Sequence, residues 1–295
     1  MTIIAQKIAD KLILRPTRHP LNAVGKERQL VPFRKGSLEV WTQRVGTHHL
    51  DEVDLFVLKF QGTAGRAERA TYHPMDCWAD LRAELWAVNP PGYGGSTGPA
   101  SVKTLAEAAR TVYLEAARLA QGRPIVVMGN SLGTTVAMHL AANFPIAGLI
   151  LRNPPPLRHL IVGRYGWWNL WLGAMLIAQK VPRQLCCVRN ARQIRCPAVF
   201  ISSRKDQTVP ANYQDKVFQN FAAPHRLLQL TNADHATSLN LDEQREYRQH
   251  LEWLREAALL TPNVSPAEST TKYSTSLGHS TKYRLPANVG AGQRS

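Results

Sequence analysis

The sequence predicts an α/β protein with a mostly parallel, eight-stranded sheet, helices on both faces and a short helical cap. Two observations support this prediction. Short apolar, β-branched segments alternate with longer segments of helical periodicity, a pattern typical of parallel strands joined by crossover helices. One connection between predicted strands, over about residues 154–195, is too long for a simple crossover. Because long inserts between strands usually serve binding, we expect this one to cap the sheet.

Composition limits the class of protein. The chain has 295 residues, of which 44% are hydrophobic and 19% charged, so it can bury a sizeable core and is not globally disordered. Its four cysteines lack a CxxC pair, which predicts neither a disulfide framework nor a structural zinc site. We find no bilayer-length apolar stretch and no signal-peptide pattern, and therefore expect a cytoplasmic protein, with peripheral contact at the inner membrane face left open.

The elements are predicted in order along a domain of residues 28–260. The first two strands, joined by the turn Arg34-Lys35-Gly36-Ser37, should form an antiparallel hairpin. Strands are expected near residues 29–33, 38–45, 53–60, 82–89, 124–129, 148–152, 197–202 and 226–231. Helices are expected near residues 68–80, 102–120, 132–143, 211–221 and 237–259.

The two ends of the chain differ from the domain. Residues 1–27 begin with an amphipathic helix that has Ile4, Ile8 and Leu12 on one face and ends by Pro16. This face suits either packing on the domain's own surface or contact with a membrane surface. Residues 261–295 are rich in Ser and Thr and poor in large aliphatic residues, which predicts a disordered tail.

The net charge of +15 is unevenly distributed. Between Glu115 and Asp206 the chain has twelve basic residues and no acidic one. No helix-turn-helix, zinc-finger or RNA-binding signature accompanies them, so we expect no nucleic-acid partner. A solvated basic face and attraction to an anionic substrate or lipid surface both remain open.

The stretch Gly129-Asn130-Ser131-Leu132-Gly133 follows a predicted strand and begins a predicted helix. This context is that of a nucleophile elbow, in which a tight turn lifts the serine hydroxyl above the sheet. Residues two before and two after the serine must be very small. The helix that begins there directs backbone N–H groups and its positive dipole end at the site.

A serine hydroxyl needs a base, and the base needs an orienting carboxylate. Loops after later strands supply both: Asp206 in "SSRKDQTVP" and His235 in "TNADHATSL". The chain order Ser131, Asp206, His235 fits an α/β-hydrolase. Other histidines fit less well, because His225 precedes its strand and His139 lies within the helix behind the serine.

An oxyanion needs two N–H donors. The backbone N–H of Leu132 should be one, and the loop "FQGTAG" after the third strand should supply the other, with Thr63 the best candidate and Ala64 the next. A plain glycine-rich turn into a helix is the alternative for this loop.

The stretches "FQGTAG", "GNSLG", "SSRKDQTVP" and "ADHA", in this order, resemble a serine hydrolase of the α/β-hydrolase superfamily. The likeness is to small acyl hydrolases related to lysophospholipases and to prolyl-oligopeptidase-like domains, and it covers roughly residues 28–260. Relatives usually have His-Gly where this chain has Gln61-Gly62. "NPPGYGGSTG" resembles the loop beside the active site of that branch, and it contains neither G-x-G-x-x-G nor a Walker lysine. The resemblance implies no cofactor and no metal; His48 and His49 near Asp51 lack a third metal ligand.

The sequence therefore predicts hydrolysis of a carboxylic ester or thioester through a covalent acyl-enzyme. Acyl transfer, peptide cleavage and a non-catalytic binding module on the same scaffold remain alternatives. We expect a small-molecule acyl substrate, anionic or lipid-like, bound below an apolar wall that the insert provides. The residues expected in that wall are Trp167, Trp168, Trp171, Leu172, Met175 and Leu176. No oligomeric state is predicted.

Overall fold

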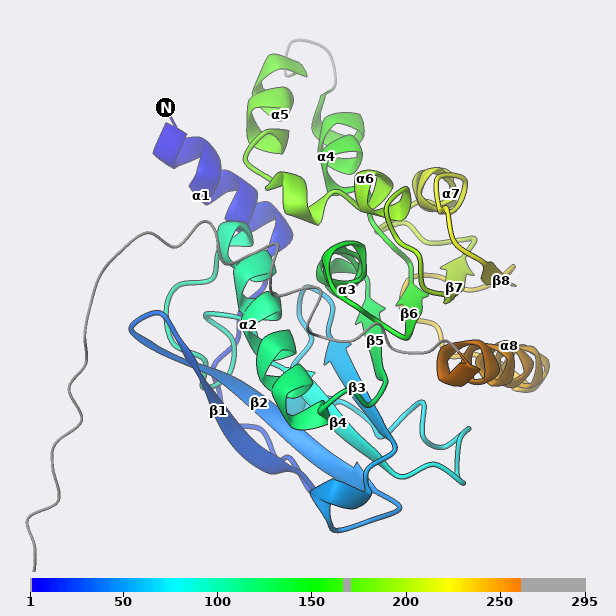
Figure 1. The fold of residues 1–295 in the computed structure, drawn as a ribbon. Helices are drawn as coiled ribbons and strands as arrows, with labels where there is room; N and C mark the ends of the chain where they lie inside the picture. The colour runs from blue at the N-terminus through cyan, green and yellow to red at the C-terminus, as the bar shows by residue number, and fades with distance from the viewer. Residues whose placement is uncertain (1, 167–170, 261–295) are drawn as a thin grey trace, which may run out of the picture. The chain divides into compact units, whose positions relative to one another are not determined.

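The computed structural model describes residues 2–166 and 171–260 of the chain. Trp167, Trp168 and the predicted tail at 261–295 lie outside the described residues. The sheet has eight strands in the order β1-β2-β4-β3-β5-β6-β7-β8 (Figure 1). The strands are β1 (Glu27–Phe33), β2 (Gly36–Val45), β3 (Leu55–Phe60), β4 (Ala83–Val88), β5 (Ile125–Asn130), β6 (Gly148–Arg152), β7 (Ala198–Ser203) and β8 (His225–Leu230).

The predicted sheet is confirmed. β3 to β8 pair in parallel, β1 and β2 form the predicted antiparallel hairpin, and β2 pairs antiparallel with β4. Every predicted strand overlaps an observed one. β3, β4 and β7 are buried along their whole length, because a parallel sheet covered on both faces buries both sets of alternating side chains.

Helices cover both faces of the sheet (Figure 1). One face packs against α2, α3 and the smaller helices α6 and α7, around Phe56, Val127 and Leu149. The other face packs against α8, around Val57 and Val199. The bounds are α2 (Val102–Ala120), α3 (Leu132–Asn143), α6 (Cys187–Ala191), α7 (Ala211–Phe218) and α8 (Leu241–Leu260).

The predicted insert between β6 and β7 is helical. It contains α4 (Leu157–Tyr165), α5 (Trp171–Ala178), a short 3-10 turn (Arg183–Leu185) and α6. α4 and α5 pack on each other, and α5 also contacts the N-terminal helix α1 (Thr2–Ile13). α1, α4 and α5 lie together at one end of the molecule in Figure 1. None of the helices within 2–166 and 171–260 is long and apolar enough to cross a membrane.

The helix predicted at 68–80 is wrong. Only a 3-10 turn forms there (Ala67–Arg69), followed by an irregular segment that buries Met75 and Trp78 against the sheet. Pro74 explains the difference, since it has no N–H to donate and disfavours helical backbone in the residue before it. Met75 and Trp78 therefore cover this part of the sheet although the segment that carries them is not helical.

α8 begins four residues later than the predicted 237. The Asn240 side chain accepts a hydrogen bond from the Glu243 N–H at 2.9 Å, and the Glu243 carboxylate accepts one from the Asn240 N–H at 2.8 Å. This reciprocal capping box fixes the first turn at Leu241.

The predicted N-terminal helix is present as α1 and is partly exposed. Ala9 and Ile13 are its buried apolar residues, whereas Ile4 and Ile8 are exposed. Of the predicted face, Ile4 and Ile8 are therefore exposed, whereas Leu12 is half-buried against the domain.

Candidate active site

Ser131 lies in the turn between β5 and α3. Its backbone has φ 49° and ψ −118°, a conformation that residues other than glycine rarely adopt. A Cβ atom on Gly129 would lie 2.6 Å from Thr134 Cα, and one on Gly133 would lie 2.0 Å from the Phe60 carbonyl oxygen. The glycine two before the serine thus permits the turn, and the glycine two after permits α3 to press against the end of β3.

Asp206 follows β7, and its carboxylate is buried. One oxygen accepts hydrogen bonds from the backbone N–H groups of Thr208 and Val209, both at 2.8 Å. The other oxygen accepts one from Gln214 Nε2 at 3.3 Å and contacts His235 Nδ1 at 2.6 Å. Four polar contacts fix this carboxylate in place, which a buried charge requires.

His235 lies on the loop after β8, and its side chain is partly exposed. Since an ionised carboxylate can only accept, Asp206 holds the proton on Nδ1 and leaves Nε2 as the basic nitrogen. The predicted acid and base are thus directly hydrogen-bonded. Among the described residues the Ser131 hydroxyl makes no hydrogen bond, so Ser131 and His235 are not directly bonded to each other.

The end of β6 connects the serine to the histidine loop. The Ser131 N–H donates to the Arg152 carbonyl at 2.8 Å. The next residue, Asn153, donates from Nδ2 to the His235 carbonyl at 3.2 Å and accepts from the Ser203 N–H at 2.9 Å. Asn153 is buried and has φ 51°, which asparagine tolerates better than most residues. Sequence reasoning missed this residue, although an Asn-Pro pair directly after a strand is a recognisable signal.

The loop after β3 lies against the serine. A Cβ atom on Gly62 would be 3.4 Å from Ser131 Cβ. The Gly62 carbonyl accepts from the Gly65 N–H at 3.0 Å, which orients the peptide that also carries the Thr63 N–H. In a trans peptide the N–H points opposite the carbonyl. Because the Gly62 carbonyl points into the turn toward the Gly65 N–H, the Thr63 N–H points out of the turn. The N–H groups of Thr63 and Leu132 have no hydrogen-bond acceptor within the described residues.

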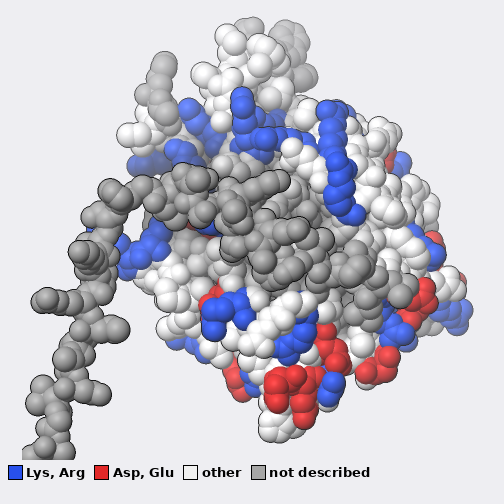
Figure 2. Space-filling view, in the orientation of Figure 1, with Lys and Arg blue, Asp and Glu red and all other residues white. Residues whose placement is uncertain are grey.

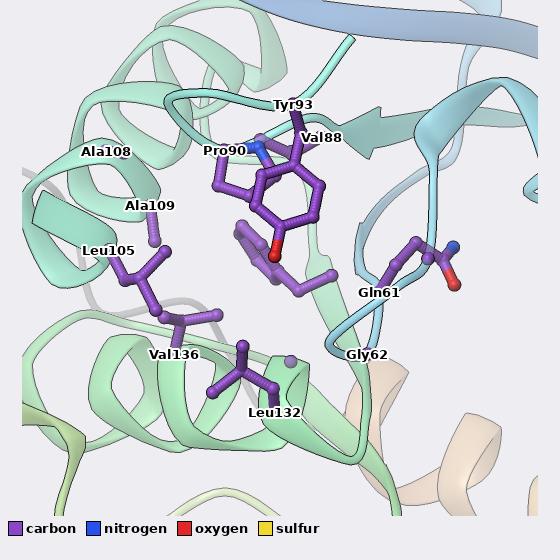
Figure 3. Close-up of a pocket in the computed structure, with 13 residues that line it drawn as sticks. Gln61, Gly62, Val88, Pro90, Tyr93, Leu105, Ala108, Ala109, Leu132 and Val136 are labelled. Atoms are coloured by element: carbon purple, nitrogen blue, oxygen red, sulfur yellow. The ribbon is translucent and has the colours of Figure 1, made fainter. Parts of the chain in front are cut away.

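Tyr93, from the "NPPGYGGSTG" segment, supports this loop. Its hydroxyl donates to the Thr63 carbonyl at 2.7 Å and accepts from the Arg15 N–H at 3.0 Å. Burial raises the pKa of the Tyr93 hydroxyl, which keeps it protonated and able to donate. In Figure 3 the Tyr93 ring extends toward the loop of Gln61 and Gly62. Sequence reasoning placed this segment beside the site but assigned no residue in it.

Two cavities adjoin the loop. The cavity in Figure 3 lies between α2, α3 and the ends of β3 and β4, is lined mostly by apolar side chains and measures about 30 Å³. It is therefore too small for an acyl chain. The second cavity, of about 120 Å³, contains Ser131 itself. Its other lining residues are Leu12, Ile13, Thr63, Leu132, Pro155, Leu157, Leu160, Ile161, Arg164, Tyr165, Thr208 and Val209.

The apolar side chains of α5 do not form the wall of the Ser131 cavity that the sequence predicts. Trp171 and Met175 are exposed on α5 and do not line the Ser131 cavity. α5 turns Ala174, Ile177 and Ala178 inward, and its exposed large side chains are Trp171, Leu172, Met175 and Leu176. The cavity walls come instead from α1 and α4. Trp167 and Trp168 lie outside the described residues.

His73, Asp76 and Cys77 are the one group of potential metal ligands found in the described part of the chain. His73 contacts Asp76 through Nδ1 at 2.7 Å and the Tyr247 hydroxyl through Nε2 at 2.9 Å. Because both ring nitrogens are occupied by these contacts, we assign no metal to this cluster.

The sequence model of the alpha/beta hydrolase family matches residues 69–250. The chain belongs to this family. The strand order and the elbow described above agree with that assignment, and the resemblance seen in the sequence is confirmed at the level of the superfamily. The sequence resemblance leads us to expect His-Gly where this chain has Gln61-Gly62, and the loop forms a turn through the Gly65 N–H and the Gly62 carbonyl.

Curated relatives of this α/β hydrolase are distant. The uncharacterized protein Rv2307c of Mycobacterium tuberculosis is 29% identical over 49% of this chain and 50% of its own length. The alpha/beta hydrolase domain-containing protein aho-3 of Caenorhabditis elegans is 25% identical over 68% of this chain and 58% of its own length. The chain thus spans about half the length of these relatives.

Solved structures share the fold at low identity. A Pyrococcus furiosus esterase has a TM-score of 0.59 and 14% identity, over 84% of this chain and 98% of that one. A Pyrococcus horikoshii acylaminoacyl peptidase has a TM-score of 0.61 and 13% identity, over 83% of this chain and 44% of that one. Family and fold together support a hydrolase.

Proposed function

We propose that this protein is a serine hydrolase that cleaves a carboxylic ester or thioester through a covalent acyl-enzyme. Ser131 is the nucleophile, His235 the general base and acid, and Asp206 the residue that orients His235. The observation that carries this proposal is the His235–Asp206 contact of 2.6 Å on loops that border the strained Ser131 turn. A buried carboxylate bonded to a partly exposed imidazole leaves one basic nitrogen toward solvent and substrate.

In the first step His235 Nε2 removes the proton from Ser131 Oγ as the oxygen attacks the acyl carbon. The negative charge that develops on the carbonyl oxygen is stabilised by the N–H groups of Thr63 and Leu132. His235 then returns the proton to the departing alcohol or thiol. Asp206 stabilises the transient imidazolium throughout.

In the second step His235 activates a water molecule, which attacks the acyl-enzyme and releases the carboxylic acid. The same triad can pass the acyl group to another acceptor, so the acceptor has to be identified by measurement. The cavity over Ser131 favours an apolar acyl group, since Leu157, Leu160 and Ile161 contribute its walls. Arg164 in the same lining favours a substrate that also carries negative charge.

Labelling with a fluorophosphonate probe tests the nucleophile. We expect wild type to be labelled and Ser131→Ala to lose labelling completely while remaining folded by circular dichroism. Ser238, an exposed serine three residues after His235, provides a matched control, and Ser238→Ala should be labelled like wild type. Folded wild type that resists the probe would favour the non-catalytic binding module.

A substrate panel then tests the reaction class. p-Nitrophenyl esters, acyl-CoA thioesters, lysophospholipids and an acylated aminoacyl anilide separate esterase, thioesterase, lipid-directed and peptidase activities. We expect turnover of esters or thioesters and release of free acid. Turnover of the anilide alone would indicate a peptidase instead. Transfer of the acyl group to an added alcohol, in place of release of free acid, would indicate an acyltransferase.

A further inference from the structure

Large apolar side chains are exposed on two neighbouring helices. α1 and α5 contact each other and lie at the same end of the molecule (Figure 1). We call their exposed apolar residues the α1–α5 face. Its members are Ile3, Ile4, Ile8, Trp171, Leu172, Met175 and Leu176. A monomer in water rarely exposes such a cluster, so this face marks an interaction site.

α5 is the less usual of the two helices. Its sequence WLGAMLIA contains no charged residue and no hydrogen-bonding side chain except the Trp171 indole. A helix that is apolar on all sides is ordinarily buried on all sides. Here Ala174 and Ala178 are buried, and Leu172 keeps 69% of its surface exposed. The packing of the cap therefore accounts for one side of α5 and leaves the other without a partner among the described residues.

The charges around this face are basic. Lys7 and Lys11 are exposed on α1, Arg15 follows it, Arg164 is on α4 and Arg183 follows α5. In Figure 2 the upper part of the molecule, over α5, is an uncharged projection with lysines and arginines below it. No acidic residue occurs in the sequence of the insert, which lies between Glu115 and Asp206.

Asp10 is the one acidic residue of α1, and it faces inward. Its carboxylate accepts hydrogen bonds from the Val102 N–H at 2.8 Å and from the Ser101 hydroxyl at 3.0 Å. It therefore caps α2 and adds little negative charge to the α1–α5 face. The face thus combines apolar side chains with uncompensated positive charge.

We propose that the α1–α5 face docks the protein onto anionic lipid bilayers. A bilayer of this kind offers an apolar interior to isoleucine, leucine and tryptophan and negative headgroups to the lysines and arginines. A second copy of this chain fits less well, because it would bring like charges together. Nucleic acid would satisfy the positive charge but would leave the apolar side chains without a partner.

Docking would also place the Ser131 cavity close to lipid. α1 carries Ile4 and Ile8 outward and contributes Leu12 and Ile13 to the cavity wall. Delivery of a lipid-borne acyl group to Ser131 rests on the function proposed above. The docking depends only on the α1–α5 face, so it can be tested in a variant that lacks catalytic activity.

Vesicle flotation of the full-length Ser131→Ala protein tests the proposal. Vesicles of phosphatidylcholine with 30% phosphatidylserine should bind it at 0.1 M NaCl, and pure phosphatidylcholine vesicles should bind it at least tenfold more weakly. Leu172→Glu should reduce binding to the anionic vesicles at least tenfold. Leu241→Glu is the matched control, because Leu241 is a leucine with 72% of its surface exposed on α8. It should bind like the parent.

Lys7→Glu combined with Lys11→Glu tests the electrostatic part. We expect this protein to lose at least tenfold in binding at 0.1 M NaCl, and the difference from the parent to shrink at 0.5 M NaCl as the charges are screened. Both side chains are exposed, so we expect the variant to unfold at the same temperature as the parent. Equal unfolding temperatures would show that the loss of binding does not come from misfolding.

Three outcomes would overturn the proposal. They are absence of binding to anionic vesicles, equal binding by Leu172→Glu and Leu241→Glu, and a dimer in analytical ultracentrifugation that Leu172→Glu dissociates. The last outcome would assign the face to a second copy of the chain. Absence of fluorophosphonate labelling in wild type would contradict the proposed function but would not contradict the docking proposal.

Discussion

At the residue scale, Asn153 joins three parts of the site. Its backbone N–H donates to the Ile201 carbonyl, and its side chain bonds the Ser203 N–H and the His235 carbonyl. It directly follows Arg152, whose carbonyl holds the Ser131 N–H. Burial lowers the pKa of the Arg152 guanidinium. In the proposed mechanism, Asn153 therefore positions His235 relative to Ser131.

Asn153→Ala should lower kcat about tenfold or more with little change in KM, because it releases the His235 loop. It should also destabilise the fold by about 2–3 kcal/mol, from lost hydrogen bonds and a left-handed alanine. Asn153→Gly removes the same hydrogen bonds but accepts the φ of 51°. It should recover part of the stability, measured by urea unfolding, and none of the kcat. Full activity in Asn153→Gly would mean that the side chain does not position His235.

At the scale of elements, Lys59 organises the irregular segment that replaces the predicted helix. Its buried ammonium group donates to the carbonyls of Thr71 and His73. Burial lowers the pKa of Lys59 from 10.5 to about 8, against a smaller opposing effect of Asp76. Because the folded-state pKa lies below that of the unfolded chain, the unfolded state binds more protons between about pH 8 and 10.5. Stability contributed by this group therefore increases as the pH rises through that window.

Lys59→Met removes this titration. Relative to the variant, wild type should gain about 1–2 kcal/mol of unfolding free energy between pH 7.5 and 9.5. Urea unfolding of both proteins at the two pH values measures the difference, and groups shared by both proteins, such as the cysteines, cancel. A difference that is constant with pH would show that Lys59 titrates normally.

α4 supplies the other test at this scale, because it forms one wall of the Ser131 cavity. Leu160→Trp should fill part of the cavity of about 120 Å³. We expect kcat/KM for a p-nitrophenyl octanoate to fall at least tenfold, and that for the acetate to change by less than about threefold. Leu172→Trp on α5, outside the cavity lining, should change neither value. Equal losses for both esters would indicate general disruption of the site.

The sequence was sufficient for elements whose pattern is local. Parallel strands are short apolar runs, and the elbow requires Gly129 and Gly133 within five residues of each other. The contact between Asp206 and His235 could be predicted because loops that follow parallel strands meet at the same edge of the sheet. The helix at 68–80 was wrong because Pro74 outweighed the apolar spacing. Asn153 and Tyr93 were missed because their partners lie far away in the chain.

At the scale of the whole molecule, the charge is distributed unevenly around the site. Most of the acidic residues on the face in Figure 2 lie in its lower half, away from α4 and α5. Some basic residues of the acid-free stretch are paired, such as Arg118 with Glu115 and Arg204 with Asp215. Arg164 forms no ion pair with any described residue and lines the Ser131 cavity. Its charge is therefore available to a substrate.

This field predicts a salt dependence that differs between substrates. p-Nitrophenyl hemisuccinate and p-nitrophenyl butyrate have acyl chains of equal length, and only the first carries a carboxylate. Between 25 and 500 mM NaCl, kcat/KM for the hemisuccinate should fall about fivefold or more. The Debye length falls below roughly 10 Å above 0.1 M salt, so the attraction between the basic residues and the carboxylate is screened. The butyrate should change by less than about twofold. Arg164→Glu should abolish the difference, whereas Arg118→Glu, on α2 and outside the cavity, should preserve it. The same salt dependence for both esters in wild type would mean that the basic surface serves solubility or docking and does not attract the substrate.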